Sequence, residues 1–451
     1  MHNTSILSSM RGDRRGFLKT AAAGIAFPVL VPGAVLGKDG ALPPSERITI
    51  GVFGVGNRGL GSLQAMAPLP DHQVVAIADC RRERREHAGE FVNKMYAGRT
   101  GYEGYQGCAL TNDFEEVLAR DDVDAVWGTI PDHWHGVLYM RCIEAGKDMY
   151  GEKPLSRWIG EGARIVDAVR RYGIVFQTGT QQRSDPKFRH ACNLARNGYL
   201  GKVHKIEVGA PGGRSYPAAP PSDPPPGFDY DRWTGPAPYF PFDARRCEWL
   251  AMYMISHYCA GFITNWGVHH LDIAGWGCPE VFEEPFEIEG EGVLPTEGMT
   301  DTWISWRCDL TWESGLTMLY TNSGNPVEQG CRFIGDEGWV HVNRKGIAAE
   351  PESLLDVRLK PADTPLHASP DIGDRHAYSS HTADFFRSVR TRQNPVSPVE
   401  SGHAASTLGN VADICLRLGR ELKWDPARGE FPDDPEANNM RTRANRAPWI
   451  I

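Results

Sequence analysis

The sequence predicts an α/β protein whose N-terminal part is built on a doubly wound parallel sheet. A short β-branched run at 48–53 leads directly into a glycine loop, and a second apolar run at 73–78 ends on Asp79. Strand-like and helix-compatible segments then alternate up to a strand at 174–177. Because parallel strands need crossover connections, usually helices, this alternation is typical of a parallel sheet with helices on both faces.

The glycine loop reads Gly54-Val55-Gly56-Asn57-Arg58-Gly59 and opens a helix-compatible segment. Gly54 permits a tight turn, Gly56 lets the backbone approach a pyrophosphate, and Gly59 lets the helix pack closely on the strand. The free N–H groups at the start of the helix bind phosphate oxygens. With a strand before it and a helix after it, the loop predicts a dinucleotide site that includes Asn57 and Arg58.

Asp79 indicates which dinucleotide is bound. It follows Gly59 by twenty residues, where the fingerprint places an acid that binds the adenosine ribose hydroxyls. A carboxylate at this position repels a 2′-phosphate, so NAD is favoured over NADP. Arg81 and Arg82 follow directly and could weaken that preference.

Two polar segments follow later predicted strands. The run at 123–130 ends in Pro131-Asp132-His133-Trp134-His135, and the run ending at Tyr150 leads into Gly151-Glu152-Lys153-Pro154. Ligands of doubly wound sheets bind at the carboxyl ends of the strands. The residues expected to contact the cofactor there are Pro131, Asp132, His135, Glu152 and Lys153.

Length and composition bound the remaining possibilities. The 451 residues suffice for two domains, and the net charge of −9 gives no electrostatic reason to expect nucleic acid. The ten cysteines include no CxxC pair, which argues against a zinc ribbon or an iron–sulfur site. Most are expected to be buried apolar residues, although some could pair in an oxidising compartment.

The N-terminus, residues 1–40, reads as a signal segment. Arg14-Arg15-Gly16-Phe17-Leu18-Lys19 precedes a mildly apolar stretch at 21–36, which is too short and too interrupted by Gly and Pro to span a membrane. The pattern resembles a twin-arginine signal, with Asp13 where Ser or Thr is usual. We therefore expect a periplasmic or otherwise exported protein that meets the twin-arginine export machinery, with no membrane span in the mature form.

Residues 47–425 resemble the glucose–fructose oxidoreductase/inositol dehydrogenase family, often called Gfo/Idh/MocA. The resemblance is carried by the glycine loop, Asp79, the segments at 131–135 and 152–154, and Asn265-Trp266-Gly267-Val268-His269-His270-Leu271-Asp272. The family pattern at the last segment is D-x-G-x-H-x-x-D, and Asn265 stands where the first Asp is usual. The other three positions match.

The resemblance implies two domains and an oligomer. It implies a Rossmann domain at 45–175 and a C-terminal α/β domain at 176–425 with a large, mostly antiparallel sheet. Strand-like runs at 203–208, 301–310 and 315–320 are consistent with that sheet. Family sheets commonly pair between subunits, so a homo-oligomer is implied. The polar tail at 426–451 either wraps a neighbouring subunit or is loose.

Lys153 and His269 are the expected catalytic residues. A partly desolvated lysine beside a positively charged nicotinamide has a lowered pKa and can handle a hydroxyl proton, and the family's catalytic lysine occupies this motif. By analogy His269 faces the substrate. If Thr264 or Asn265 caps a helix, Asn265, His269 and Asp272 share one face, although His269 could instead be a core histidine satisfied by Asp272. Asn265 can hydrogen-bond a substrate hydroxyl but cannot act as a base.

Two further residues are expected near the substrate. Arg183 follows the strand ending near Thr178, and Trp233 lies in a proline- and aromatic-rich segment at 210–242. We interpret this segment as an ordered excursion whose aromatic residues either stack on a sugar or pin the loop. Adjacent histidines on a helix point about 100° apart, so His269 and His270 are not expected to share a metal.

Three functional hypotheses follow. The first is an NAD-dependent oxidoreductase that transfers hydride between nicotinamide and a hydroxyl of a sugar, cyclitol or sugar derivative. The second is a glycoside hydrolase that keeps its NAD and works by transient oxidation, elimination and hydration, as in NAD-dependent α-N-acetylgalactosaminidases. The third is a non-catalytic dinucleotide-binding homologue, which only the departure at Asn265 favours.

Overall fold

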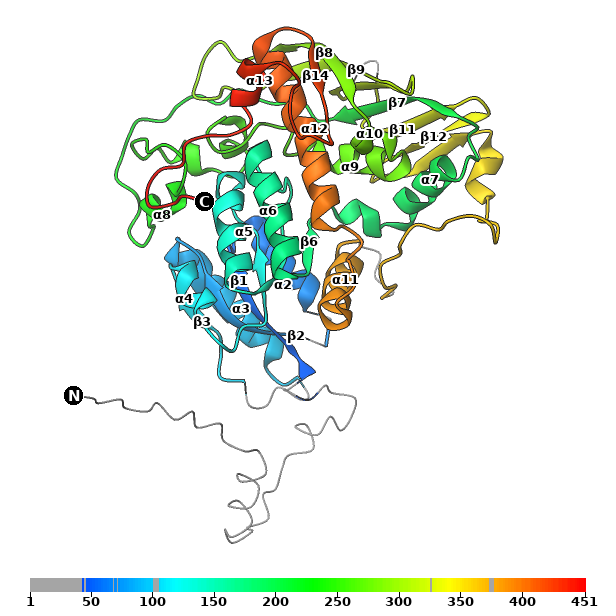
Figure 1. The fold of residues 1–451 in the computed structure, drawn as a ribbon. Helices are drawn as coiled ribbons and strands as arrows, with labels where there is room; N and C mark the ends of the chain where they lie inside the picture. The colour runs from blue at the N-terminus through cyan, green and yellow to red at the C-terminus, as the bar shows by residue number, and fades with distance from the viewer. Residues whose placement is uncertain are drawn as a thin grey trace, which may run out of the picture.

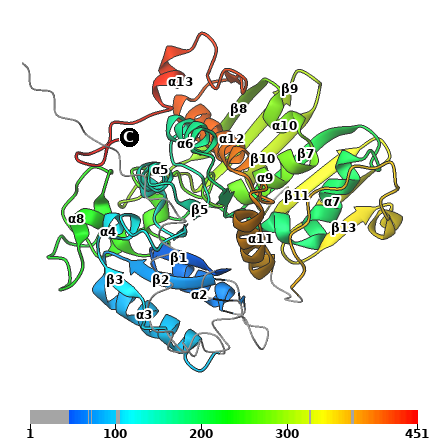
Figure 2. The same ribbon diagram turned by 60° about the horizontal axis from the view of Figure 1, so that its bottom comes forward.

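The computed structural model describes residues 43, 46–67, 69–70, 72–99, 105–324, 327–372 and 377–451. The signal segment expected at 1–40 lies outside the described residues. Within them the chain forms two sheets, one of six strands and one of eight, with helices packed on both (Figures 1 and 2). No helix of the described part is long and apolar enough to cross a membrane.

The first sheet is wholly parallel, as the alternation of strands and helices predicts. Its order is β3-β2-β1-β4-β5-β6. The strands are β1 (Ile48–Phe53), β2 (His72–Ala78), β3 (Ala109–Thr111), β4 (Ala125–Gly128), β5 (Asp148–Gly151) and β6 (Phe176–Thr178). The helical segments are α2 (Asn57–Met66), α3 (Arg82–Tyr96), α4 (Phe114–Leu118), η5 (Asp132–Trp134), α5 (His135–Glu144), α6 (Ile159–Tyr172) and η6 (Gln181–Ser184).

The strand order reverses at β1, which lies between β2 and β4. The glycine loop follows β1, and the segment from Thr129 to Asp132 follows β4, so both lie at the carboxyl edge of the sheet. This is the topological switch point, where doubly wound sheets bind their ligands. The expectation of a dinucleotide site here therefore agrees with the topology.

The second sheet is mostly antiparallel, as the family resemblance implies, and its order is β13-β12-β11-β7-β10-β9-β8-β14. Within this sheet, as far as the described residues go, only the β7–β10 pairing is parallel. The strands are β7 (Val203–Ala210), β8 (Phe286–Val293), β9 (Ser305–Trp312), β10 (Thr317–Asn322), β11 (Gly330–Gly335), β12 (Gly338–Val342), β13 (Ile347–Glu350) and β14 (Leu422–Trp424). The helical segments are α7 (Pro186–Arg196), α8 (Tyr230–Thr234), η7 (Arg245–Cys247), η8 (Met252–Met254), α9 (Val268–Gly277), α10 (Glu280–Glu283), η9 (Glu352–Asp356), α11 (Ala377–Thr391), α12 (Val399–Leu418) and α13 (Pro435–Asn439).

Two late helices tie the sheets together. Helix α12 packs against α6 of the first domain and α9 of the second, and Figure 1 shows it in orange between them. Helix α11 returns to the first domain, where Phe385 and Phe386 are fully buried beside Trp127 of β4. The first sheet is thus completed by residues more than 200 positions downstream of β6.

The C-terminal tail lies against the first domain of its own chain. Arg443 donates to the carbonyl oxygen of His133 at 2.7 Å, and the Trp449 ring packs on Trp134 with centroids 4.9 Å apart. These contacts describe a packed tail rather than a loose one. The aromatic side chain near the end anchors the tail because its burial is favourable.

Candidate active site

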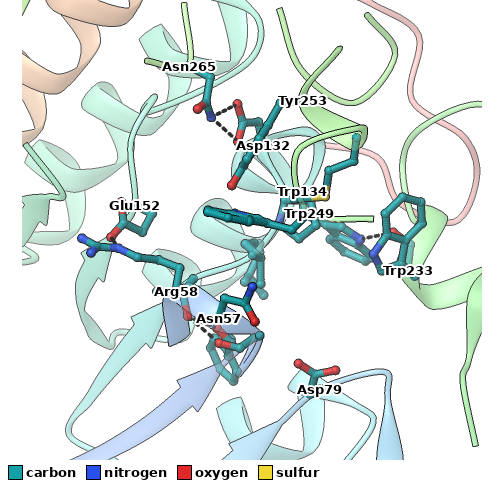
Figure 3. A pocket seen from close by; sticks show the side chains of 18 of the residues that line it. Asn57, Arg58, Asp79, Asp132, Trp134, Glu152, Trp233, Trp249, Tyr253 and Asn265 are labelled. Carbon is teal, nitrogen blue, oxygen red and sulfur yellow. Dashed lines mark hydrogen bonds and ion pairs between the residues drawn. The ribbon is translucent and has the colours of Figure 1, made fainter. Parts of the chain in front are cut away.

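A cleft of about 620 Å³ runs between the two domains at the carboxyl edge of the parallel sheet (Figure 3). One wall comes from the glycine loop and from the ends of β4 and β5. The other wall comes from residues 247–253, from the start of α9 and from the turn between β12 and β13. The cleft is therefore built by segments that are far apart in the sequence.

The glycine loop has the shape that the sequence predicts. Gly54 has φ +75°, and a Cβ there would overlap the carbonyl oxygen of Thr129. A Cβ on Gly59 would overlap the carbonyl oxygen of Gly54, so this glycine permits close packing without lining the cleft itself. Gly56 begins helix α2, and no side chain among the described residues caps it. The first N–H groups of α2 are thus free for an anion, which is the fit that a dinucleotide pyrophosphate requires.

Asp79 lines the cleft and also fixes the loop. Its Oδ2 accepts a hydrogen bond from the Val55 N–H at 2.8 Å, and its Oδ1 accepts from the Arg81 N–H at the same distance. Arg81 and Arg82, the expected modifiers, are not among the residues that line the cleft, and Arg81 stacks on Phe228. The cationic side chains at this end are Arg84, whose Nη1 would lie 2.9 Å from a Cβ on Gly56, and Arg232, which pairs with Asp113 and Asp229.

Arg58 and Glu152, both expected at the cofactor, line the cleft and pair with each other. Arg58 Nε donates to Glu152 Oε1 at 2.6 Å, and its guanidinium lies 4.0 Å over the Tyr378 ring. Burial opposes the charge of Arg58, yet the adjacent Glu152 carboxylate raises its pKa overall. Asn57 and Pro131 also line the cleft.

Lys153 is held at the centre of the cleft by the residue that departs from the family pattern. Its Nζ donates to the backbone oxygen of Asn265 at 2.6 Å and lies 3.2 Å from Asn265 Oδ1. Asn265 Nδ2 in turn donates to both carboxylate oxygens of Asp132, at 3.1 and 2.9 Å. Burial lowers the pKa of Lys153, and the carboxylates of Asp132 and Glu152 oppose part of that shift.

His269 faces the same cleft, but helix α9 is not capped as the sequence suggests. The helix begins at Val268 with Gly267 as its N-cap, so Thr264 and Asn265 lie in the turn before it. Gly267 is required there because a Cβ would overlap the hydroxyl of Tyr320. Burial, together with the cations Arg344 and Lys153, lowers the pKa of His269 well below its usual value, so the ring is neutral.

The alternative interpretation of His269 as a core residue satisfied by Asp272 does not match the contacts. Asp272 accepts two hydrogen bonds from Arg183, at 2.7 and 2.8 Å, and both side chains are buried. Neither ring nitrogen of His269 has a hydrogen-bond partner among the residues that the structure describes, and Nδ1 is buried. Because His269 lines the cleft, Nε2 is the nitrogen left for a ligand there.

Three expected site residues are placed differently by the structure. Arg183 does not line the cleft, because its guanidinium is hydrogen-bonded to Asp272. His135 is fully buried, with its ring nitrogens 2.6 Å from the Pro154 oxygen and 3.1 Å from the Ile130 oxygen, so it ties two cleft segments together. Trp233 does line the cleft, but on the Asp79 side, away from Asn265 (Figure 3). It is thus placed for the adenosine part of a dinucleotide.

Sequence reasoning missed several residues of the opposite wall. They are Trp249, Tyr253 and Trp266, which carry aromatic surface into the cleft, and Arg344, which carries a charge. Trp249 is exceptional in being 53% exposed, and it lies across the middle of the cleft in Figure 3. Trp266 lies within the family motif, which is the signal that could have identified it; the others have no motif of their own.

The histidines near the cleft do not form a metal site. His270 turns away from His269 and lies 3.3 Å from Gln182, with its ring stacked on Phe188. Within the described part of the chain, no group of three or more His, Cys, Asp or Glu side chains could hold a metal ion. All ten cysteines are free, and eight of them are buried.

Comparison with known proteins identifies the class that this fold and cleft define. Residues 48–180 match the model described as "Oxidoreductase family, NAD-binding Rossmann fold", and residues 213–451 match "Oxidoreductase family, C-terminal alpha/beta domain". The chain belongs to the Gfo/Idh/MocA oxidoreductase family. It is therefore an enzyme of an NAD-binding oxidoreductase family.

Curated relatives differ in how much of the chain they match. Oxidoreductase YrbE of Bacillus subtilis is 27% identical, with 83% of this chain and 96% of that protein covered. Myo-inositol 2-dehydrogenase of Thermotoga maritima is 24% identical, with 84% and 99% covered. A glycosyl hydrolase family 109 protein of Shewanella pealeana is 31% identical, but the match covers only 36% of this chain and 38% of that protein. The structure of scyllo-inositol dehydrogenase from Lactobacillus casei with NAD(H) and scyllo-inositol shares the fold, with a TM-score of 0.58, 15% identity, and 84% and 99% coverage.

Proposed function

We propose that this enzyme transfers a hydride between NAD and a hydroxyl-bearing carbon of a sugar, cyclitol or sugar derivative. The observation that carries the proposal is the placement of Lys153 Nζ on Asn265, at the carboxyl edge of the Rossmann sheet and in the same cleft as His269. Dehydrogenation of a polyol needs a group that removes a hydroxyl proton beside the hydride acceptor. Lys153 is placed to be that group.

The chain's own residues divide the proton chemistry between them. NAD, when bound over the glycine loop, supplies the hydride acceptor. The carbinol carbon would give its hydrogen to that acceptor as hydride, and the hydroxyl proton passes to the unprotonated Lys153 Nζ, a form that burial favours by lowering the pKa. His269 is neutral and lines the cleft, and its Nε2 has no partner among the described residues, so it orients the hydroxyl by hydrogen bonding through Nε2. Asn265 contributes an amide that accepts from Lys153 but takes no proton.

We further propose NAD over NADP. Asp79 lines the adenosine end of the cleft, where its carboxylate would repel a 2′-phosphate. Arg84 acts against this preference, since its guanidinium lies over Gly56 at the same end. Fluorescence titration with NAD and with NADP tests this preference, and tighter binding of NAD would support it.

A second candidate reaction is glycoside hydrolysis with recycled NAD. The partial likeness to glycosyl hydrolase family 109 proteins favours it, and so does the arginine pair Arg14-Arg15, because an exported enzyme cannot readily replace its cofactor. Oxidation of one sugar carbon would acidify its neighbour, elimination would release the aglycone, and hydration and return of the hydride would complete the cycle. Cleavage of an aryl glycoside without net NADH would support this reaction. Undiminished cleavage by protein stripped of NAD would contradict it.

Export and assembly are also proposals. We propose export through the twin-arginine machinery to the periplasm or cell exterior, on the basis of Arg14 and Arg15. A fusion of residues 1–45 to a reporter should be exported, and replacement of both arginines by lysine should retain it in the cytoplasm. We propose a homo-oligomer because one face of the large sheet is packed by α7, α9 and α12, while the other carries half-buried residues such as Lys205 and Arg332. Light scattering measures the assembly.

The central test is a panel of sugars, cyclitols and sugar derivatives, including sugar acids, with NAD, followed by the absorbance of NADH. Lys153→Met should lower kcat by roughly 10²- to 10⁴-fold at saturating NAD, because the lysine serves proton transfer. Lys202→Met, at an exposed lysine outside the cleft, is the matched control and should have no effect. Absence of NAD reduction with every polyol, or an unaffected Lys153→Met variant, would refute the proposal.

A further inference from the structure

Arg344 stands at the substrate end of the cleft on a turn that is rigidly held. The turn joins β12 to β13, and Asn343 Oδ1 accepts from the Lys345 and Gly346 N–H groups at 2.8 and 3.0 Å. Asn343 Nδ2 also donates to the Gln329 oxygen at 3.2 Å, which ties the turn to the neighbouring strand. The position of Arg344 is thus set by the sheet.

Arg344 belongs to the same surface as the catalytic histidine. Its guanidinium lies 5.0 Å from the Trp266 ring, and the Trp266 ring is 5.6 Å from the His269 ring in an edge-on arrangement. Arg344 is also one of the charges that lower the pKa of His269. A substrate bound at His269 and Lys153 is therefore close enough to Arg344 to interact with its positive charge.

One cation at this end of the cleft has no carboxylate partner. Arg58 pairs with Glu152 at 2.6 Å, and Asp132 accepts two hydrogen bonds from the Asn265 amide. Arg344 lines the same cleft, is exposed, and has no ion-pair partner among the residues that the structure describes. Its guanidinium can bind a planar carboxylate through two parallel hydrogen bonds.

We propose that the substrate is a sugar acid, whose carboxylate is bound by Arg344 while the hydroxyl to be oxidised faces Lys153 and His269. This rests on the proposed polyol oxidoreductase function and narrows its substrate class. The paired donors of one guanidinium match the two oxygens of one carboxylate, whereas a phosphate ester carries close to two negative charges at neutral pH. A neutral hexose offers Arg344 hydroxyl acceptors but no charge-assisted pair.

The test is calorimetric titration of the NAD-loaded protein with sodium D-glucuronate, D-galacturonate and D-mannuronate, each compared with its hexose and its hexose 6-phosphate. At least one uronate should bind 10- to 100-fold more tightly than both counterparts, as expected for a charge-assisted hydrogen-bonded pair. Arg344→Gln should reduce that ratio to about one. Lys345→Gln, which removes the next cation on the same turn but not from the cleft lining, should preserve it.

The inference is overturned if every uronate binds no better than its hexose or its 6-phosphate, or if Arg344→Gln keeps the full ratio. Unchanged NAD binding by Arg344→Gln shows that the variant is folded. Turnover is measured separately on the same samples. Arg344-dependent uronate binding without NAD reduction would refute the oxidoreductase reaction alone, whereas oxidation of neutral polyols without uronate preference would refute the sugar-acid assignment alone.

Discussion

The buried pair of Arg183 and Asp272 provides a test of whether Arg183 is structural or binds substrate. The two side chains are 7% and 0% exposed and meet through two hydrogen bonds of 2.7 and 2.8 Å. At an effective dielectric constant of 20, two charges 2.7 Å apart attract each other by about 6 kcal/mol. Desolvation offsets much of this attraction, but removal of one partner leaves the other uncompensated. Arg183→Met should therefore lower the free energy of unfolding by roughly 3–5 kcal/mol.

The loss should depend on pH in a defined direction. Burial raises the pKa of Asp272 and Arg183 opposes that rise, so without Arg183 the folded-state pKa climbs further. A carboxyl whose folded pKa is raised binds its proton more tightly in the folded state. Its contribution to stability is then present below the unfolded pKa and is lost as the pH rises toward the folded pKa. Arg183→Met should thus be more destabilising at pH 8 than at pH 4.

The double variant Arg183→Met/Asp272→Leu removes both charges and should recover most of the loss, because an apolar pair of similar volume replaces an ion pair at little cost. Urea unfolding at several pH values measures all three proteins, and the KM for the substrate is measured beside them. The reasoning is refuted if Arg183→Met unfolds like the wild type, or if the double variant is as unstable as the single one. If Arg183→Met kept the stability of the wild type but had a higher KM, Arg183 would be a substrate-binding residue.

Three further predictions follow from the cleft. For substrate oxidation, kcat/KM should rise with pH on an acidic limb that lies below the ordinary lysine range, since Lys153 acts when deprotonated and burial lowers its pKa. Asp132→Asn removes a carboxylate that opposes the shift and should move this limb to lower pH, as a pH–rate profile will show. Gly54→Ala should lower the free energy of unfolding by roughly 1–3 kcal/mol and weaken NAD binding, because φ is +75° and the methyl group meets Thr129. Gly61→Ala, at a position in open space on α2, is the control and should raise the free energy of unfolding by about 0.5–1 kcal/mol. Thermal unfolding measures both variants. Asp79→Asn should reduce the ratio of NADP to NAD dissociation constants by about tenfold or more in fluorescence titrations, and an unchanged ratio would show that Asp79 does not select the cofactor.

Local patterns predicted the first domain well because its signals are short-range. The glycine loop, the strand before it and the acid at Asp79 are contiguous motifs, and each needs a particular backbone geometry that few residues permit. Lys153 and His269 were found through family motifs, and the structure brings both to one cleft. The predicted cap of α9 was wrong because Gly267 begins the helix, and its position is dictated by the close approach of Tyr320 from β10.

What the sequence by itself determined was the Rossmann fold, the dinucleotide-binding loop, and the choice of a lysine and a histidine, Lys153 and His269, that the structure places in one cleft. The tertiary structure alone decided which polar residues face the cleft. From the sequence, Arg183 and His135 were both candidates for binding a ligand. In the folded chain Arg183 donates to Asp272, and the ring of His135 bonds to two backbone oxygens, so neither is available to a ligand. Arg344 carries no motif, and it reaches the site only because β12 and β13 pair at the far end of the second sheet. Such partnerships depend on contacts between residues far apart in the chain, whose energies exist only once both sheets have formed.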